Sequence, residues 1–321
     1  MNKYDTTPDN ILKTLKKYGV AVIPSLLNET EINNMNNGMW DYLEYITSNF
    51  DNTTHGVINR NNKTTWKSFY SLYPMHSMLI QHWSIGHAQH VWDLRQNPKV
   101  VDIFAKIWNC NHEDLLTSFD ASSFHFPPED TNRGYYRQPW LHCDQSFTRN
   151  DFECVQSWVT GYDVHEDDAT LLILEKSHLY HEEFKNHFNI DKKDDWYQLK
   201  EEEIKFFMDK GCTMKRISCP AGSMVLWDSR TIHCGSEPIK GRQHKTFRNV
   251  SYICMIPRKL ATKANIDKKI KALNNLRTTT HWPNRAKLFS KMPRTYGGPV
   301  PNIKQINPPV LTELGKRLAG Y

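Results

Sequence analysis

The stretch WLHCDQSF, residues 140–147, decides how the rest of the chain is interpreted. His142 and Asp144 are two residues apart, so on an extended strand their side chains point to the same side of the sheet. An imidazole nitrogen and a carboxylate oxygen placed in this way can bind one metal ion together. Cys143 points to the opposite side, and we expect it in the core.

Two protein ligands do not make a stable metal site, and the best candidate for a third is His233. It lies in the stretch WDSRTIHCG, residues 227–235, where it follows an apolar run and precedes Gly235. This position predicts a strand end that faces a turn. Two histidines and one carboxylate are the ligand set of non-heme Fe(II) oxygenases, which leaves metal positions open. A His-x-Asp pair alone is not specific, because polar pairs of this kind also occur in surface turns.

Length and composition favour a globular protein with a sizeable core. The chain has 321 residues, of which 39% are hydrophobic and 12% aromatic, and this composition argues against a globally disordered protein. The net charge of +6 permits an acidic substrate or weak contact with nucleic acid but demands neither. Recognisable nucleic-acid-binding motifs are absent from the sequence.

The sequence also carries no targeting or disulfide pattern. It has no apolar run of the roughly 18 residues needed to cross a bilayer, and residues 1–10 lack a signal-peptide pattern. The seven cysteines are scattered without a CxxC pair, which argues against a zinc knuckle or a disulfide framework. We therefore expect a cytoplasmic protein with reduced thiols.

We predict one domain spanning residues 1–321, beginning with a helical support over 1–114. Thr7 and Pro8 predict a helix start, and Gly19 predicts its end. Asn28 and Glu31 have the spacing of a capping box. The remaining expectations for this part are a strand over 20–24, a long helix after residue 28, irregular loops over 50–80, and helices over 86–96 and from 97 onward.

The middle of the chain, residues 115–257, consists mainly of short segments rich in strand-forming residues, separated by turns. This pattern predicts an antiparallel sandwich or barrel. An interruption over about 178–211 is charged and partly helical, and we interpret it as an insertion between strands. Residues 258–321 form a C-terminal extension with a basic helix over 264–276 and an ordered tail rich in Pro and Gly. The predicted strands cover 117–125, 140–146, 154–164, 169–174, 213–218, 223–228, 231–234 and 246–256.

Arg248 lies on the strand that follows the one ending in His233. A buried guanidinium needs an anionic partner, and a dicarboxylate cosubstrate would supply one through a bidentate pair. A structural salt bridge with a core carboxylate is an equally good reading of Arg248 alone. Arg242 is the competing candidate, although its polar turn, residues 240–243, favours a solvated role.

Taken together, these motifs resemble the phytanoyl-CoA dioxygenase-like branch of the Fe(II)/2-oxoglutarate oxygenases. The resemblance extends from about Leu12 to Pro257, and the tail after about 258 has no counterpart in it. One departure is Lys176, which stands where the family usually has glycine before Ser-His. The matching stretches, in chain order, are 18–24, 27–31, 142–144, 169–178, 221–227 with His233, and 247–248.

The resemblance implies a double-stranded β-helix (jelly-roll, cupin-like) with flanking helices, and it implies a cofactor set. Fe(II) would be held by His142, Asp144 and His233, and Arg248 would bind the far carboxylate of 2-oxoglutarate. With O₂, the cosubstrate would be decarboxylated to succinate while an organic substrate is hydroxylated. The related halogenases replace the carboxylate ligand by a small residue, so the presence of Asp144 predicts hydroxylation.

Further residues are weaker candidates for the same pocket. Trp158, Gln145 and Ser123 are expected beside the cosubstrate, with core packing or a strand end as the alternative. Contact with substrate is left open for Arg230, His125 and Arg137, and Arg230 has the alternative of holding Asp228. The other residues considered near the site are Ser122, Ser146, Arg133, Trp140, Tyr135, Tyr136 and Trp282, whereas His178 and His181 are expected in a polar loop.

A second class of function stays open beside the oxygenase. It is a non-catalytic β-helix module that binds a ligand or partner and keeps a metal only for structure. For the enzyme, the sequence does not choose between a small molecule and a peptide as substrate, and it does not indicate an oligomeric state.

Overall fold

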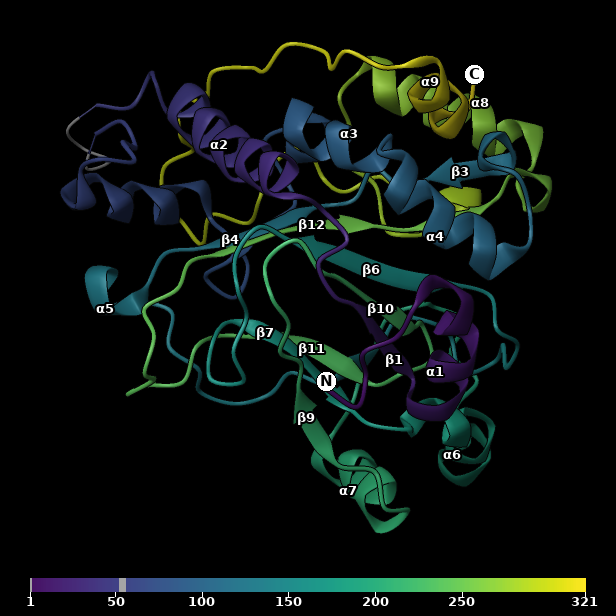
Figure 1. Ribbon diagram of the computed structural model, residues 1–321. Helices are drawn as coiled ribbons and strands as arrows, with labels where there is room; N and C mark the ends of the chain where they lie inside the picture. Colours follow the sequence, from purple (N-terminus) through teal and green to yellow (C-terminus); the bar gives the residue numbers. More distant parts are fainter. Residues whose placement is uncertain (1, 52–55) are drawn as a thin grey trace.

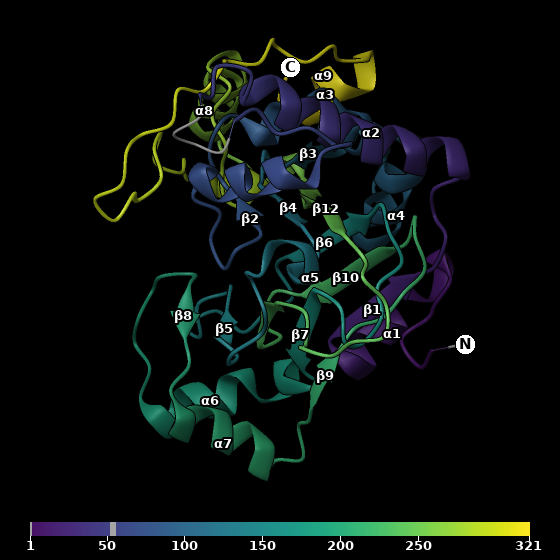
Figure 2. The same cartoon turned by 90° about the vertical axis from the view of Figure 1, so that its left-hand side faces the viewer.

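The computed structural model describes residues 2–51 and 56–321, and it contains two antiparallel sheets on either side of a buried apolar layer (Figures 1 and 2). The six-stranded sheet has the strand order β1-β10-β6-β12-β4-β2, and the five-stranded sheet has the order β8-β5-β11-β7-β9. The expected double-stranded β-helix with flanking helices is confirmed. The strands of the first sheet are β1 (Val20–Ile23), β2 (Leu79–Ile80), β4 (Ser122–His125), β6 (Val155–Thr160), β10 (Met224–Asp228) and β12 (Arg248–Ile253).

The second sheet carries the two histidines of the predicted metal site. Strand β11 lies between β5 and β7, and His233 stands opposite His142 in the antiparallel register. A separate two-stranded sheet pairs β13 with β3. The bounds of these strands are β3 (Leu115–Thr117), β5 (His142–Cys143), β7 (Thr170–Leu174), β8 (Tyr197–Gln198), β9 (Met214–Arg216), β11 (His233–Ser236) and β13 (Met255–Pro257).

Helices cover the outer face of the six-stranded sheet and the far end of the five-stranded one (Figures 1 and 2). Helices α2, α3 and α4 lie over the larger sheet, whereas α6 and α7 lie at the opposite end of the molecule. The α-helices are α1 (Ile11–Tyr18), α2 (Glu29–Ile46), α3 (Gln89–Arg95), α4 (Pro98–Trp108), α5 (Pro128–Thr131), α6 (His181–Phe188), α7 (Glu201–Asp209), α8 (Lys263–Asn274) and α9 (Glu313–Ala319), and the 3₁₀ helices are η1 (Pro8–Asn10), η3 (Lys63–Leu72), η4 (Ile85–His87), η5 (His112–Asp114), η6 (Ser177–Tyr180), η7 (Arg258–Leu260) and η8 (Pro283–Arg285).

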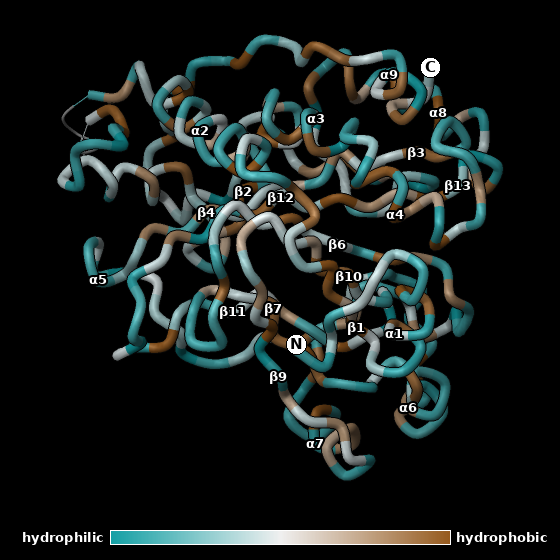
Figure 3. Tube along the Cα trace, in the orientation of Figure 1, coloured by the Kyte–Doolittle hydropathy of each residue, from teal (hydrophilic) through white to brown (hydrophobic). Residues whose placement is uncertain are grey.

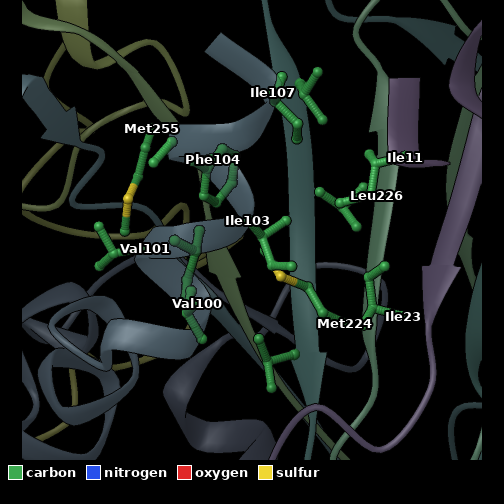
Figure 4. Packing of buried hydrophobic residues seen from close by; sticks show 14 of the residues in the cluster. Ile11, Ile23, Val100, Val101, Ile103, Phe104, Ile107, Met224, Leu226 and Met255 are labelled. Atoms are coloured by element: carbon green, nitrogen blue, oxygen red, sulfur yellow. The ribbon is translucent and has the colours of Figure 1, made fainter. Parts of the chain in front are cut away.

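Alternation along β10 explains why this strand is buried on both faces. Successive side chains of a strand point to opposite sides. Met224 and Leu226 pack against α4 and α1, as Figure 4 shows, whereas Val225 and Trp227 face the layer between the sheets. In Figure 3 the hydrophobic colour gathers along β10 and α4, while α5 is hydrophilic. The strand is therefore apolar at almost every position, because no face of it meets water.

Local signals in the sequence set the helix ends. Gly19 has φ 79°, and its N–H donates to the Leu15 carbonyl, so the chain leaves α1 in the left-handed region that glycine tolerates. The Asn28–Glu31 capping box is confirmed by reciprocal hydrogen bonds of 2.9 and 2.8 Å. Thr7 was expected to cap the first helix, but its side chain makes no capping hydrogen bond and the helix begins with the 3₁₀ turn η1.

Several boundaries differ from the sequence prediction. Within 50–80 the expected loop is interrupted by η3 and ends in β2, and residues 52–55 lie outside the described residues. The predicted strand 117–125 is divided into β3 and β4, and 140–146 shrinks to β5. The insertion holds α6, β8 and α7, and the tail ends in α9, which the pattern did not reveal. Among the described residues no helix is long and apolar enough to cross a membrane.

Candidate metal centre

His142, Asp144 and His233 converge where β5 and β11 of the five-stranded sheet lie side by side. The Asp144 Oδ2 atom lies 3.6 Å from His142 Nε2 and 3.4 Å from His233 Nε2. The candidate ligand atoms of all three lie within 4.8 Å of one another. Within the described residues this is the one group of three or more His, Cys, Asp and Glu side chains close enough to share a metal ion.

Backbone carbonyls orient both imidazoles toward this point. His142 Nδ1 lies 3.2 Å from the Trp140 carbonyl, and His233 Nδ1 lies 2.8 Å from the Thr231 carbonyl. A carbonyl can only accept, so each Nδ1 carries the hydrogen and each Nε2 keeps its lone pair. This is the tautomer in which histidine binds a metal through Nε2.

The protonation states also suit a cation. Burial on its own raises the pKa of Asp144, but the neighbouring imidazoles of His142 and His281 outweigh it and hold that pKa well below its usual value. Burial, together with the proximity of His142, lowers the pKa of His233. Near neutral pH the carboxylate is therefore ionised and the His233 ring is neutral, as metal ligands must be.

The Trp227 indole lies beside the same imidazole. Its N–H donates to His233 Nε2 at 3.2 Å. An indole N–H and a cation cannot share one lone pair, so metal binding at His233 requires Trp227 to release this hydrogen bond. The indole satisfies the buried imidazole until then, since an unpaired buried nitrogen is costly.

Arg248 lines the same cavity as the three candidate ligands, and the volume of this cavity is about 650 Å³. The residue is 3% exposed. Its Nε donates to Ser123 Oγ at 3.1 Å and its Nη1 donates to the Ala169 carbonyl at 2.9 Å. Among the described residues no carboxylate pairs with Arg248, so the structural salt bridge considered from the sequence is not formed there. A buried guanidinium without a counter-charge calls for an anion from outside the chain.

The other predicted cosubstrate residues take different places. Trp158 is fully buried, and the Arg248 guanidinium lies over its indole, 5.5 Å from the ring centroid. Ser123 accepts a hydrogen bond from Arg248 Nε. The structure does not bring Gln145 to the cavity. Its Nε2 donates to the carbonyls of Arg149 and Asp151, and its Oε1 accepts from Ser229, so the amide holds the turn that follows β5.

Arg242, the competitor of Arg248, and Arg230, considered for substrate contact, both pair with carboxylates of the chain. The prediction of a solvated Arg242 is wrong, because its side chain is fully buried and pairs with Glu129 at 2.9 Å and Asp168 at 2.7 Å. Arg230 holds Asp228, with its Nη2 at 2.6 Å from Oδ2. Both are thus structural ion pairs rather than free cations.

The remaining candidates lie outside the cavity or form its rim. His125 is buried opposite Arg248 in the β12–β4 register and does not line the cavity. Arg133, Tyr135 and Arg137 line a neighbouring space of about 550 Å³. Ser122 and Ser146 bond to other residues near them, and His178 and His181 are buried against backbone carbonyls rather than in the expected polar loop.

Several residues of the cavity wall escaped the sequence analysis as site residues, among them Gln156, Asp120, His76 and His281. Gln156 lines the cavity and its buried Nε2 has no partner in the described chain, while Asp120 enters from the residues just before β4. His76 stacks on Trp140 at 3.9 Å, and Trp140 stacks on His142 at 4.6 Å. His281 enters from the C-terminal extension. No local motif marks them, because only the fold brings them together.

Comparison with known proteins identifies the family of the chain. The sequence model of the family Phytanoyl-CoA dioxygenase (PhyH) matches residues 15–247. The Ava biosynthesis cluster protein O of Aspergillus versicolor is 29% identical over 218 residues, which cover 64% of this chain and 66% of that protein. The chain thus spans just under two thirds of that relative's length.

A solved structure of low identity shares the fold. The putative oxidoreductase of Salmonella typhimurium LT2 has a TM-score of 0.58 at 14% identity, with 98% of this chain and 82% of that chain covered. The epimerase SnoN, solved with Fe³⁺, alpha ketoglutarate and nogalamycin RO, has a TM-score of 0.49 at 12% identity and coverages of 78% and 83%. The carbocyclase SnoK has a TM-score of 0.48 at 15% identity and coverages of 79% and 87%. With the family match over most of its length, this chain belongs to the phytanoyl-CoA dioxygenase family.

Proposed function

We propose that the protein is an Fe(II)- and 2-oxoglutarate-dependent dioxygenase that hydroxylates an organic substrate and converts 2-oxoglutarate to succinate. The observation that carries this proposal is one cavity shared by His142, Asp144, His233 and an Arg248 that lacks a carboxylate partner in the described chain. Metal ligands on one sheet and an unpaired buried cation on the other, facing one cavity, suit a metal ion together with a diacid.

The donor set fits Fe(II). Two neutral imidazoles and one carboxylate suit a borderline divalent ion, and they leave positions open for further ligands. Bound iron would supply the activation of O₂. The task of the chain is to hold His142 and His233 as neutral donors and Asp144 as an anion. The carbonyl partners of the two imidazoles support this, as do the lowered pKa values of Asp144 and His233.

Arg248 is placed to bind the far carboxylate of 2-oxoglutarate. Its Nε and Nη1 are held by Ser123 and Ala169, so the side chain is fixed before the ligand arrives. A fixed guanidinium loses little conformational freedom on forming a charged hydrogen bond. The unpaired Nε2 of Gln156 on the same cavity is a further donor for a carboxylate or keto oxygen.

The aromatic lining of the cavity is suited to an organic substrate. Trp140, Trp196 and Trp282 supply aromatic walls, and Asp120 and His281 supply polar groups among them. Such walls keep water from the reacting carbon and hold a ring or chain by contact. The carboxylate of Asp144 at the third ligand position favours hydroxylation over halogenation.

Succinate formation tests the proposal. Purified protein with Fe(II), O₂ and 2-oxoglutarate is expected to release succinate, faster with substrate, and His142→Ala or Asp144→Ala is expected to abolish it. His112→Ala is the matched control, because His112 also lies beside a carboxylate, Asp102 at 3.5 Å, but far from the cavity lining. Absence of succinate and of 2-oxoglutarate binding under anaerobic Fe(II) would favour the non-catalytic module. A product heavier by one oxygen per succinate supports hydroxylation.

A further inference from the structure

The C-terminal extension meets the metal-binding turn at Trp282. The Trp282 Nε1–H donates to the backbone carbonyl of Asp144 at 3.3 Å. Trp282 is 2% exposed, and it packs in one cluster with Cys154, Cys254 and Ile256. Two residues 138 positions apart in the sequence are thus joined at the centre of the candidate site.

Asp144 needs an anchor of this kind because it lies beyond the sheet. Strand β5 has only two residues, and it pairs with β11 at His142 and with β8 as far as Cys143. Aspartate has a short side chain, so the position of its carboxylate follows the position of its own backbone. Metal ligands have to be held within roughly 0.5 Å of the productive geometry. The indole hydrogen bond restrains the backbone at the point where the ladder no longer does.

Trp282 is itself held by a clamp of charged residues. The Arg285 guanidinium lies 3.8 Å from its ring centroid, and the Arg149 guanidinium lies 5.4 Å from it. Both arginines donate to the same Glu153 Oε2, at 2.7 and 2.8 Å. Arg149 also pairs with Asp195 of the insertion. The clamp (Arg149, Glu153, Arg285) therefore joins the turn after the metal motif, the insertion and the C-terminal extension.

We propose that Trp282 is a positioning residue, which fixes the Asp144 backbone and so raises the affinity of the site for its metal ion. The inference rests on the proposed metal role of Asp144. It assigns a function in the site to an extension that lies beyond residues 15–247, the part matched by the family model.

The test measures metal affinity in the full-length protein without substrate, because Trp282 also lines the cavity and would affect turnover in more than one way. Metal-free protein is titrated with Co(II), followed by visible absorption and calorimetry. Trp282→Phe keeps an aromatic ring and removes the N–H donor. We expect its Co(II) affinity to fall roughly tenfold, as for other groups that orient metal ligands, together with a changed absorption spectrum of the bound Co(II).

Trp108→Phe is the matched control. Trp108 packs on the same cluster, and its Nε1–H also donates to a backbone carbonyl, that of Met255 at 2.7 Å, but it does not line the cavity. We expect this variant to lose stability as Trp282→Phe does and to bind Co(II) like the wild type. A loss of Co(II) affinity of the same size in both variants would mean a general packing effect and would overturn the inference.

Glu153→Gln provides an independent arm if Trp282→Phe does not fold, because it loosens the clamp without touching the indole. We expect a smaller fall in Co(II) affinity, and an unchanged affinity in the variants that fold overturns the inference. If the wild type and Trp282→Phe bind Co(II) equally well, only the role of Trp282 is refuted. Wild-type protein that fails to bind Co(II) at all refutes the metal site and this inference with it.

Discussion

Arg248 is the buried cation of the cavity that lacks a carboxylate partner in the described chain. A buried cation whose Nε and Nη1 are already held has one remaining function that the surroundings suggest, which is to meet an anion. Replacing Arg248 by Met removes a charged hydrogen bond worth about 2–3 kcal/mol, so we expect the KM for 2-oxoglutarate to rise about 100-fold. Co(II) binding is expected to stay unchanged, since Arg248 is not a ligand.

Arg242→Met gives the contrasting measurement. Its guanidinium is held by Glu129 and Asp168, so its loss leaves two carboxylates without their partner and lowers the melting temperature. The KM for 2-oxoglutarate of the folded fraction is expected to match the wild type. An unchanged KM in Arg248→Met with a raised KM in Arg242→Met would reverse the two assignments.

Buried His90 predicts how stability depends on pH. Burial lowers its pKa from the usual 6.5 to about 3, with a smaller contribution from nearby Arg95. Because the folded pKa lies below the unfolded one, the unfolded chain binds the extra proton between these values. The stability is therefore complete above pH 6.5 and is lost as the pH falls toward 3. Between pH 7 and pH 5 the protonation of this histidine in the unfolded chain lowers the free energy of unfolding by about 2 kcal/mol.

The check is a series of unfolding curves from pH 7 to 5 for wild type and His90→Leu. We expect a shallower fall in the free energy of unfolding for the variant, since leucine does not titrate. Parallel curves for the two proteins would show that His90 is not protonated on unfolding in this range. His87, whose pKa burial also lowers to about 3, keeps a residual pH dependence in the variant.

At the scale of elements, the start of α2 shows how one cap couples two helices. Asn28 accepts from the Glu31 N–H, and the Glu31 carboxylate accepts from Asn97 at 2.8 Å and from Lys99 at 2.7 Å at the start of α4. Asn28→Ala removes the cap and is expected to lower the free energy of unfolding by about 1 kcal/mol in urea.

Asn111→Ala is the control for this prediction. Asn111 precedes η5, and its side chain makes no capping hydrogen bond. We expect a change within about 0.5 kcal/mol, as for most exposed substitutions. Equal losses in Asn28→Ala and Asn111→Ala would mean that the reciprocal bonds at α2 contribute nothing measurable.

Elements with local signals were predictable, and elements that depend on distant partners were not. Gly19 and the pair Asn28–Glu31 set helix ends through contacts within a few residues, so the sequence alone reveals them. Strand β8 has two residues and exists only because it pairs with β5. The 3₁₀ helix η3 has irregular composition, and its apolar side chains Trp66 and Phe69 are buried by tertiary contacts.

At the scale of the whole molecule, the same distinction divides the candidate site. His142, Asp144, His233 and Arg248 could be predicted because each lies in a short motif on a strand or directly after one, and the structure brings all four to one cavity. The walls could not, because Asp120, Trp196 and His281 come from segments with no motif of their own. The division into support, core, insertion and extension within one domain stays a prediction.

One metal ion is proposed to be held by His142 on β5, Asp144 directly after this strand, and His233 on the neighbouring β11. Titration of metal-free protein with Co(II), followed by visible absorption, tests it most directly. We expect one Co(II) per chain and loss of tight binding in each of His142→Ala, Asp144→Ala and His233→Ala, with His112→Ala unaffected. Undiminished Co(II) binding in the three ligand variants would contradict it.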